Sequence, residues 1–148
     1  MTTLYDTDFH AWAQQQAEAL RKKDWAALDL DNLVEEVEDL ARRHRDALGS
    51  ELKRLLVHLL KWRYQPTHRG DSWLESIEQA RQAMDEVIED HPSLADAPPL
   101  MLPKAYQRAR RQAARETKLP LATFPAEGCP WDLDDVRREG WLPPEEPL

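Results

Sequence analysis

The sequence contains a single cysteine, Cys129, and only four glycines. One cysteine cannot form an intramolecular disulfide, and by itself it cannot build a thiolate metal cluster. This favours a reducing compartment, most simply the cytoplasm. Few glycines together with 32% charged and 41% hydrophobic residues favour helices over sheets and argue against wholesale disorder.

Long hydrophobic runs are also missing. The first thirty residues show no basic start followed by an apolar core, so we expect no secretory signal and no membrane span. A net charge of −8 argues against general binding to nucleic acid or to an anionic membrane. There is no Gly-rich phosphate loop, no Ser/His/Asp signature and no Cys-x-x-Cys pair, and we predict no cofactor and no metal.

Proline is nearly absent from the first ninety residues, because ten of the eleven prolines lie at Pro92 or later. We therefore predict a single helical domain over residues 1–148. It comprises a bundle core at 1–91, a proline-bounded connection with a basic helix at 92–118, and an extended strap at 119–148. The predicted fold is all-α, a bundle of four to five helices with one long central helix and a strap rich in proline and tryptophan.

Apolar residues at helical spacing predict where the first helices lie. One helix runs from about residue 8 to 22 or 23, with Thr7 as its N-cap. Asp29 or Asp31 caps the next helix, whose apolar stripe stays in phase across Gly49. This helix must end before Pro66, because a proline disfavours helical angles in the residue before it. We expect one long helix there, with Gly49 as the place where it can kink.

The later helices have weaker signals. Ser72 and Glu75 match a capping box that begins a helix ending near His91. Residues 92–103 predict a stiff connection, and a basic helix follows over about 104–117. A short helix is expected near 132–138.

Charge is divided unevenly in the last third of the chain. Between residues 104 and 118 six cations accompany one acid, Glu116, whereas from Glu127 onward seven acids accompany two arginines. The six cations are Lys104, Arg108, Arg110, Arg111, Arg115 and Lys118. Two interpretations stay open, an acidic tail that docks on a basic helix or a site for a polyanion.

His58 is the one polar residue in the apolar run 55–60. Burying an imidazole without a hydrogen bond costs about 1 to 3 kcal/mol, so it needs a partner. His44, Glu51 and His58 recur every seven residues along this helix. Each is therefore about 10.5 Å from the next along the helix axis, which is too far for two of them to bind one metal. We expect His58 to pair with Glu36, Glu116 or a backbone oxygen, the alternative being a ligand or catalytic role.

Two further groups of residues are candidates for chemistry. Glu36 lies beside the apolar stripe and can turn inward, which allows a metal-assisted hydrolase or nuclease site that joins Glu36, His58, Lys61 and Glu116 across helices. Cations also alternate with aromatic residues around Pro66. There Trp62, Arg69 and Trp73 are candidates for binding an anion or a partner, or are simply corner residues of the core.

Several short motifs follow one another along nearly the whole chain. These are LYDTDFHAW from Leu4, LDLDNLVEEVEDL from Leu28, LLVHLLKWRYQP from Leu55, SW at Ser72, PSL at Pro92, RET at Arg115 and FPAEGCP at Phe124. In this order they resemble a known bacterial family, the domain of unknown function 29. Trp131 stands where the family pattern has tyrosine.

The resemblance implies a bacterial cytosolic protein with a helical fold, and it implies no activity. The motif residues that match are Glu35, Glu36, His58, Lys61, Trp62, Pro66, Trp73 and Glu116.

Because no convergent catalytic set is present, the leading hypothesis is a non-enzymatic module that binds an unidentified protein partner or itself. The hydrolase or nuclease is the first alternative. A nucleic-acid accessory protein that uses the basic helix 104–118 is the second.

Overall fold

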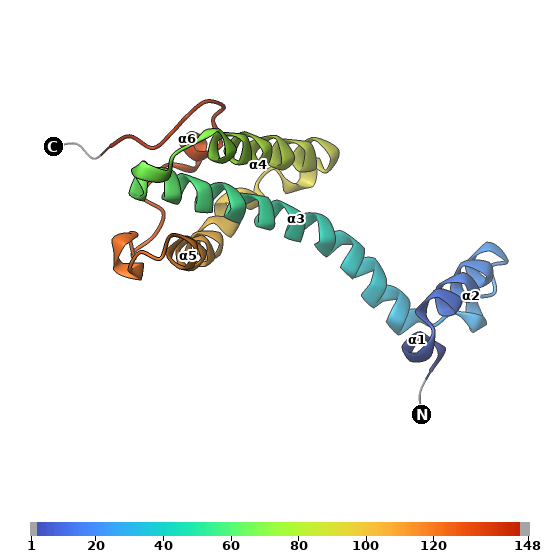
Figure 1. The fold of residues 1–148 in the computed structure, drawn as a ribbon. Helices are drawn as coiled ribbons and strands as arrows, with labels where there is room; N and C mark the ends of the chain where they lie inside the picture. The colour runs from blue at the N-terminus through green and yellow to red at the C-terminus, as the bar shows by residue number, and fades with distance from the viewer. Residues whose placement is uncertain (1–2, 146–148) are drawn as a thin grey trace. The chain divides into compact units, whose positions relative to one another are not determined.

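The computed structural model describes residues 3–145, which form six α-helices, four 3-10 turns and no strand (Figure 1). The α-helices are α1 (Leu4–Thr7), α2 (Phe9–Arg21), α3 (Leu30–Tyr64), α4 (Asp71–Asp90), α5 (Ala97–Thr117) and α6 (Leu133–Arg137). The 3-10 turns are Trp25–Ala27, Pro66–His68, Pro92–Leu94 and Leu121–Thr123. The prediction of an all-α fold with one long helix is confirmed. The predicted number of four to five helices was too low, because the single turn α1 precedes α2.

The chain divides into two compact units, and the division lies within α3. The N-terminal unit ends at Arg43 and the C-terminal unit begins at His44. The prediction that residues 1–148 form one domain stays a prediction.

α3 is continuous across Gly49, as its unbroken apolar stripe predicts. A Cβ atom added at Gly49 would meet only the Met101 sulfur at 3.9 Å, an ordinary contact, so no close approach of another element requires glycine there. The helix ends at Tyr64, two residues before Pro66, because a proline disfavours helical angles in the residue before it.

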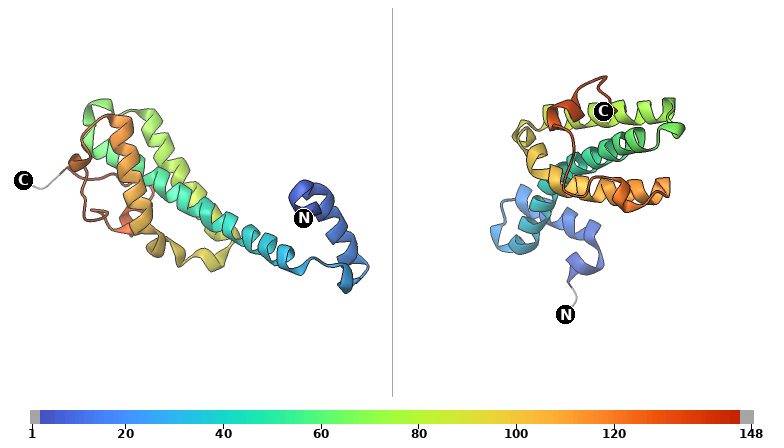
Figure 2. Two further views of the ribbon diagram at one scale, coloured as in Figure 1. Left: turned by 90° about the horizontal axis from the view of Figure 1, so that it is seen from below. Right: turned by 90° about the vertical axis from the view of Figure 1, so that its left-hand side faces the viewer.

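The C-terminal unit holds the main core, built by the second half of α3 packing against α4 and α5 (Figure 2). Every buried residue of α3 lies at Leu48 or later. Core residues that are fully shielded from solvent include Leu48, Leu52, Leu55, Leu56, Leu59, Leu60, Ala80, Met84, Tyr106, Ala109, Ala113, Phe124 and Val136. The apolar stripe read from the sequence therefore divides into a buried half and an unburied half.

The N-terminal unit has a much smaller interior. The rings of Tyr5, Phe9 and Trp12 form an aromatic triangle with centroids 4.8 to 5.7 Å apart. Asp29 accepts a hydrogen bond from the Trp12 indole nitrogen at 3.0 Å, and its backbone amide donates to Gln16 at 2.7 Å. These two hydrogen bonds between Asp29 and the side chains of Trp12 and Gln16 thus hold α2 against the start of α3, although the unit has no large apolar core.

The predicted caps of two helices differ from those observed. Thr7 is the last residue of α1, and Asp8 caps α2 by accepting from the Ala11 amide at 3.0 Å. Ser72 lies inside α4, which begins at Asp71 without a side-chain cap, so the predicted capping box is wrong.

The predicted stiff connection before the basic helix is largely helical, since α5 already begins at Ala97. Pro98 and Pro99 lie in its first turn, where the missing amide hydrogens would have no helical partner anyway. Of the three prolines of α5, only Pro103 lies beyond the first turn, in the interior of the helix.

The C-terminal segment (residues 119–145) contacts α4 and α5 through backbone carbonyls. Arg110 of α5 donates to the carbonyls of Phe124 and Leu121, each at 3.0 Å, and the Tyr106 hydroxyl donates to that of Pro125 at 2.6 Å. The short helix expected near 132–138 is α6.

Candidate functional site

His58 finds its partner on its own helix. Its Nδ1 lies 2.8 Å from the carbonyl oxygen of Arg54, one turn earlier, so that nitrogen carries the hydrogen and donates. The ring is half-buried, although its chain neighbours Val57 and Leu59 are buried. Of the partners expected for His58, the structure shows the backbone oxygen.

Lys61 and Glu116 meet across α3 and α5. The Lys61 Nζ lies 3.3 Å from a Glu116 carboxylate oxygen and 5.9 Å from the centre of the Trp73 ring. The lysine side chain is only 12% exposed and the glutamate side chain 43% exposed, so the pair lies at the edge of the core. An ion pair and a ring face together satisfy the lysine without any ligand.

Arg69 folds back onto the end of α3. Its Nε donates to the Trp62 carbonyl at 2.7 Å, and its guanidinium lies 5.0 Å from the centre of the Trp62 ring. A Glu145 oxygen lies 3.8 Å from the same group. The structure therefore brings Trp62 and Arg69 together and places Trp73 beside Lys61. Both cations, Lys61 and Arg69, are already paired with groups of the chain itself. A role for the three in binding an anion or partner stays a prediction.

Glu36 belongs to the N-terminal unit, where it accepts a hydrogen bond from the Tyr5 hydroxyl at 2.5 Å. This bond, together with burial and the charges of Glu36, Glu35 and Asp39, raises the pKa of Tyr5 to about 12. His58, Lys61 and Glu116 belong to the C-terminal unit. Within neither unit do the four candidates of the hydrolase hypothesis form one site.

Metal ligation has no ready donor set in residues 3–145. No group of three or more His, Cys, Asp or Glu residues there could hold a metal ion. His44 stacks on His91 with ring centroids 3.9 Å apart, rather than continuing a polar line toward His58. In the same part of the chain no buried side-chain polar atom lacks a hydrogen-bond partner.

The family model of the domain of unknown function DUF29 matches residues 4–142. The chain belongs to the DUF29 family. No curated protein and no solved structure matches this DUF29 chain. Over residues 3–145, no helix has the length and apolar character needed to cross a membrane. The family description assigns no activity.

Arg81 is the residue of this DUF29 protein that the sequence analysis missed. Its side chain is 3% exposed and donates to the carbonyls of Val136 at 2.9 Å and Trp141 at 2.7 Å, and to Glu78 at 2.6 Å. One signal was available, because Arg81 lies four residues after Ile77 and three before Met84, on the buried face of α4. Arg81 thus anchors the C-terminal segment to α4.

We expect His58 to make the stability of this DUF29 protein depend on pH. Burial lowers the pKa of His58, and the charges of Lys61 and Arg54 lower it further, while the Arg54 carbonyl and Glu116 partly oppose them. The unfolded chain, with an ordinary histidine pKa of about 6.5, therefore takes up the proton first as pH falls. The contribution of the neutral His58 ring to folding stability is therefore fully present above about pH 6.5. It is lost as the pH falls from there toward the lowered pKa of the folded state.

The check compares urea unfolding midpoints at about pH 7.5 and about pH 5 for the wild type and His58→Asn, whose amide can still donate near Nδ1. The wild type should lose more stability between the two pH values than the variant does. His68→Asn, at an exposed histidine, serves as the matched control and should behave like the wild type. Equal losses in the wild type and His58→Asn would contradict the expectation.

Proposed function

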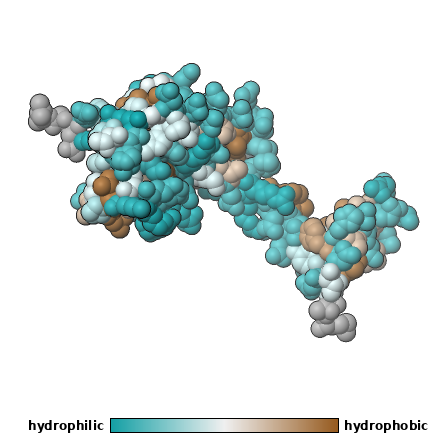
Figure 3. Space-filling model, viewed as in Figure 1, coloured by the Kyte–Doolittle hydropathy of each residue, from teal (hydrophilic) through white to brown (hydrophobic). Residues whose placement is uncertain are grey.

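We propose that this protein is a non-enzymatic module that associates with a second copy of itself through its N-terminal unit. The observation that carries the proposal is where the exposed large hydrophobic residues lie. Eight of the ten in residues 3–145 belong to that unit: Leu4, Phe9, Leu20, Trp25, Leu30, Val34, Val37 and Leu40. Figure 3 shows hydrophobic residues gathered over the part of the chain labelled α1 and α2 in Figure 1. Such a concentration on a soluble domain marks an interaction surface.

The first part of α3 carries the seam of this surface. Leu33, Val37 and Leu40 recur at the four-and-three spacing of a heptad, the pattern that packs one helix along another. Val37 is 62% exposed and Leu40 is 54% exposed, so the described residues of the N-terminal unit leave them largely uncovered. Because an isolated helix is marginal in water, a partner helix on this stripe would stabilise it.

Charge order favours an identical partner in antiparallel orientation. The acids Glu35, Glu36, Glu38 and Asp39 are followed one turn later by Arg42 and Arg43. Glu36 and Arg43 lie on the same flank of the seam, and an antiparallel pair brings this flank of the two helices together. If Val37 of one copy packs on Leu40 of the second copy, Glu36 of the first therefore approaches Arg43 of the second, and symmetry repeats both contacts. A parallel pair would instead bring opposite flanks of the two helices together, so Glu36 and Arg43 would not meet.

The seam alone is small for a stable dimer. Residues 30–43 make about four helical turns, whereas stable interfaces bury about 1,200 Å² or more. Phe9 and Trp25, which are 49% and 62% exposed in the same unit, add the aromatic area that such interfaces use. We include them in the surface for that reason.

Sedimentation velocity over a range of concentrations tests the dimer. Leu40→Lys puts a charge at the centre of the seam and should weaken association about a hundredfold, yet leave the helix content by circular dichroism unchanged because Leu40 is exposed. Leu121→Lys changes an exposed leucine outside the N-terminal unit and is the matched control. A monomeric wild type, or equal weakening by both variants, would reject the proposal.

Cysteine cross-linking in a Cys129→Ser background tests the orientation. Antiparallel packing predicts that Val37→Cys chains form a disulfide only when mixed with Leu40→Cys chains, because the two sulfurs must come within bonding reach. A disulfide between two Val37→Cys chains would instead indicate a parallel pair.

The remaining finer assignments belong to the same proposal. A bacterial cytoplasmic location is supported by the family motifs and by a lone cysteine whose thiol pKa is raised by burial, which keeps it unreactive. A strap-like role for the C-terminal segment is supported by its contacts with Arg81, Tyr106 and Arg110.

A further inference from the structure

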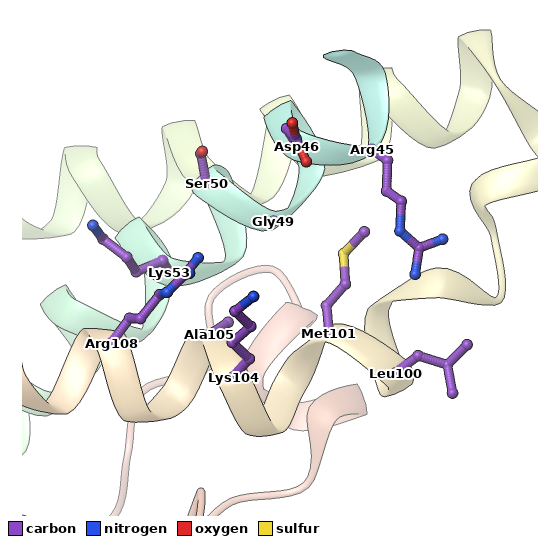
Figure 4. Close-up of a pocket in the computed structure, with 10 residues that line it drawn as sticks. All are labelled: Arg45, Asp46, Gly49, Ser50, Lys53, Leu100, Met101, Lys104, Ala105 and Arg108. Carbon is purple, nitrogen blue, oxygen red and sulfur yellow. The ribbon is translucent and has the colours of Figure 1, made fainter. Parts of the chain in front are cut away.

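A cleft in the C-terminal unit lies between α3 and α5 (Figure 4). Its volume is about 620 Å³, within the range of small-molecule sites. The residues that line it are Arg45, Asp46, Gly49, Ser50, Lys53, Leu100, Met101, Lys104, Ala105 and Arg108. None of them belongs to the proposed dimer surface, which lies in the N-terminal unit.

The cleft gathers positive charge in an acidic protein. Arg45, Lys53, Lys104 and Arg108 face one carboxylate, Asp46, although the whole chain carries a net charge of −8. Within residues 3–145 none of these four cations has an ion-pair or hydrogen-bond partner, in contrast to Lys61, Arg69, Arg81 and Arg110. Like charges brought together without counter-charges repel one another, so an anion in the cleft would be stabilised by all four.

The cations are divided along the cleft. Figure 4 shows Lys53 of α3 and Arg108 of α5 near one end, with Lys104 next to them, and Arg45 with Leu100 at the other end. Between the two ends Met101 rises from α5 toward Gly49. One end therefore suits several phosphate groups, while the other offers a guanidinium and apolar atoms on which a flat ring can stack.

We propose that this cleft binds an organic phosphate with at least two phosphate groups on a flat apolar body, the chemistry of a nucleoside di- or triphosphate. The phosphates lie against Lys53, Lys104 and Arg108, and the ring packs on Met101 and Leu100. Asp46 and Ser50, which also line the cleft, accept hydrogen bonds from amino or hydroxyl groups of the ligand. Leu100 is 74% exposed without a ligand, and burial under a ring accounts for an apolar side chain in that position.

A long nucleic acid fits this cleft less well. Arg111 and Arg115 continue the exposed cations of α5 beyond the cleft, whereas Arg110 is bound to the carbonyls of Phe124 and Leu121. What favours a small organic phosphate is the apolar end of the cleft at Met101 and Leu100, which a strand bound through its phosphates would leave uncovered.

Isothermal titration calorimetry with ATP at low salt tests the site in the full-length protein. We expect one ATP per chain, and Arg108→Gln or Lys53→Gln should each weaken binding about tenfold by removing a charge-assisted contact. Arg111→Gln removes an equally exposed cation from the same helix outside the cleft and should leave binding unchanged. Absence of ATP binding, or equal weakening by Arg111→Gln, would overturn the proposal.

Inorganic tripolyphosphate and a single-stranded oligonucleotide distinguish the other ligands. Leu100→Ser should weaken ATP binding about threefold while leaving tripolyphosphate binding unchanged, because only ATP has a ring to pack. If tripolyphosphate binds as tightly as ATP, the apolar part of the proposal is wrong. If the oligonucleotide binds more tightly than ATP and loses affinity with Arg111→Gln, the ligand is a nucleic acid instead. Circular dichroism shows whether each variant remains folded, and Leu40→Lys should leave ATP binding unchanged because the two sites are independent.

Discussion

Replacing Arg81 with methionine should lower the free energy of unfolding by about 3 kcal/mol, a large loss for a single substitution. The arginine is nearly fully buried and satisfies the carbonyls of Val136 and Trp141. Methionine keeps most of the volume but leaves both carbonyls without a donor, and each such group costs about 1 to 3 kcal/mol. Glu78, which also accepts from the Gly140 amide, would lose its charge partner as well.

Urea unfolding at neutral pH measures this loss, with Arg138→Met as the matched control. Arg138 also pairs with an acid three residues away, Asp135, but its side chain is 59% exposed. An exposed pair contributes at most about 1 kcal/mol, so the control should change little. If both variants lose the same stability, the carbonyl contacts of Arg81 do not hold the C-terminal segment in place.

Arg81 also shows what a sequence pattern can and cannot reveal. Its spacing from Ile77 and Met84 places it on the buried face of α4, and that much could have been read from the sequence. Its partners could not, because Val136 and Trp141 lie 55 and 60 residues further along the chain. Periodicity reports which face of a helix is buried, whereas hydrogen bonds between distant segments depend on the packing of the whole unit.

The long helix was predictable because its signal is strong and repeated. An apolar stripe that stays in phase across Gly49 outweighs the roughly 1 kcal/mol cost of one glycine in a helix. The start of α5 was not predictable in the same way. Pro98 and Pro99 indicate a break in most contexts, but the first turn of a helix tolerates them, and local sequence does not show which case applies.

The candidate site was predictable only in part. Arg69 packs on Trp62 because the Pro66 turn fixes the local geometry between α3 and α4. Lys61 and Glu116 also meet, but across α3 and α5, which no local pattern fixes. The expected pairing of His58 with a side chain from another helix was one of several options, and the carbonyl of its own preceding turn satisfies it instead. Glu36 turned toward Tyr5, a partner that helical spacing within one element cannot indicate.

Replacing Phe124 with alanine should cost about 3 to 5 kcal/mol, the range for deleting a buried aromatic ring from a core. Phe124 is fully buried although it lies in the C-terminal segment, outside any long helix. Its ring meets that of Tyr64 edge-on, with centroids 5.4 Å apart, and its carbonyl accepts from Arg110. A cavity at this position would remove packing from α3 and from the segment together.

Thermal unfolding followed by circular dichroism gives the measurement, and the midpoint should fall by about 10 °C for a domain of this size. Leu121→Ala, three residues earlier and 43% exposed, is the control and should cost about 0.5 kcal/mol or less. A single cooperative transition at a lower temperature in Phe124→Ala would mean that the segment unfolds together with the helices. Were Phe124→Ala to unfold at the wild-type temperature, the segment would contribute no core packing, and the carbonyl contacts with Arg81 and Arg110 alone would hold it.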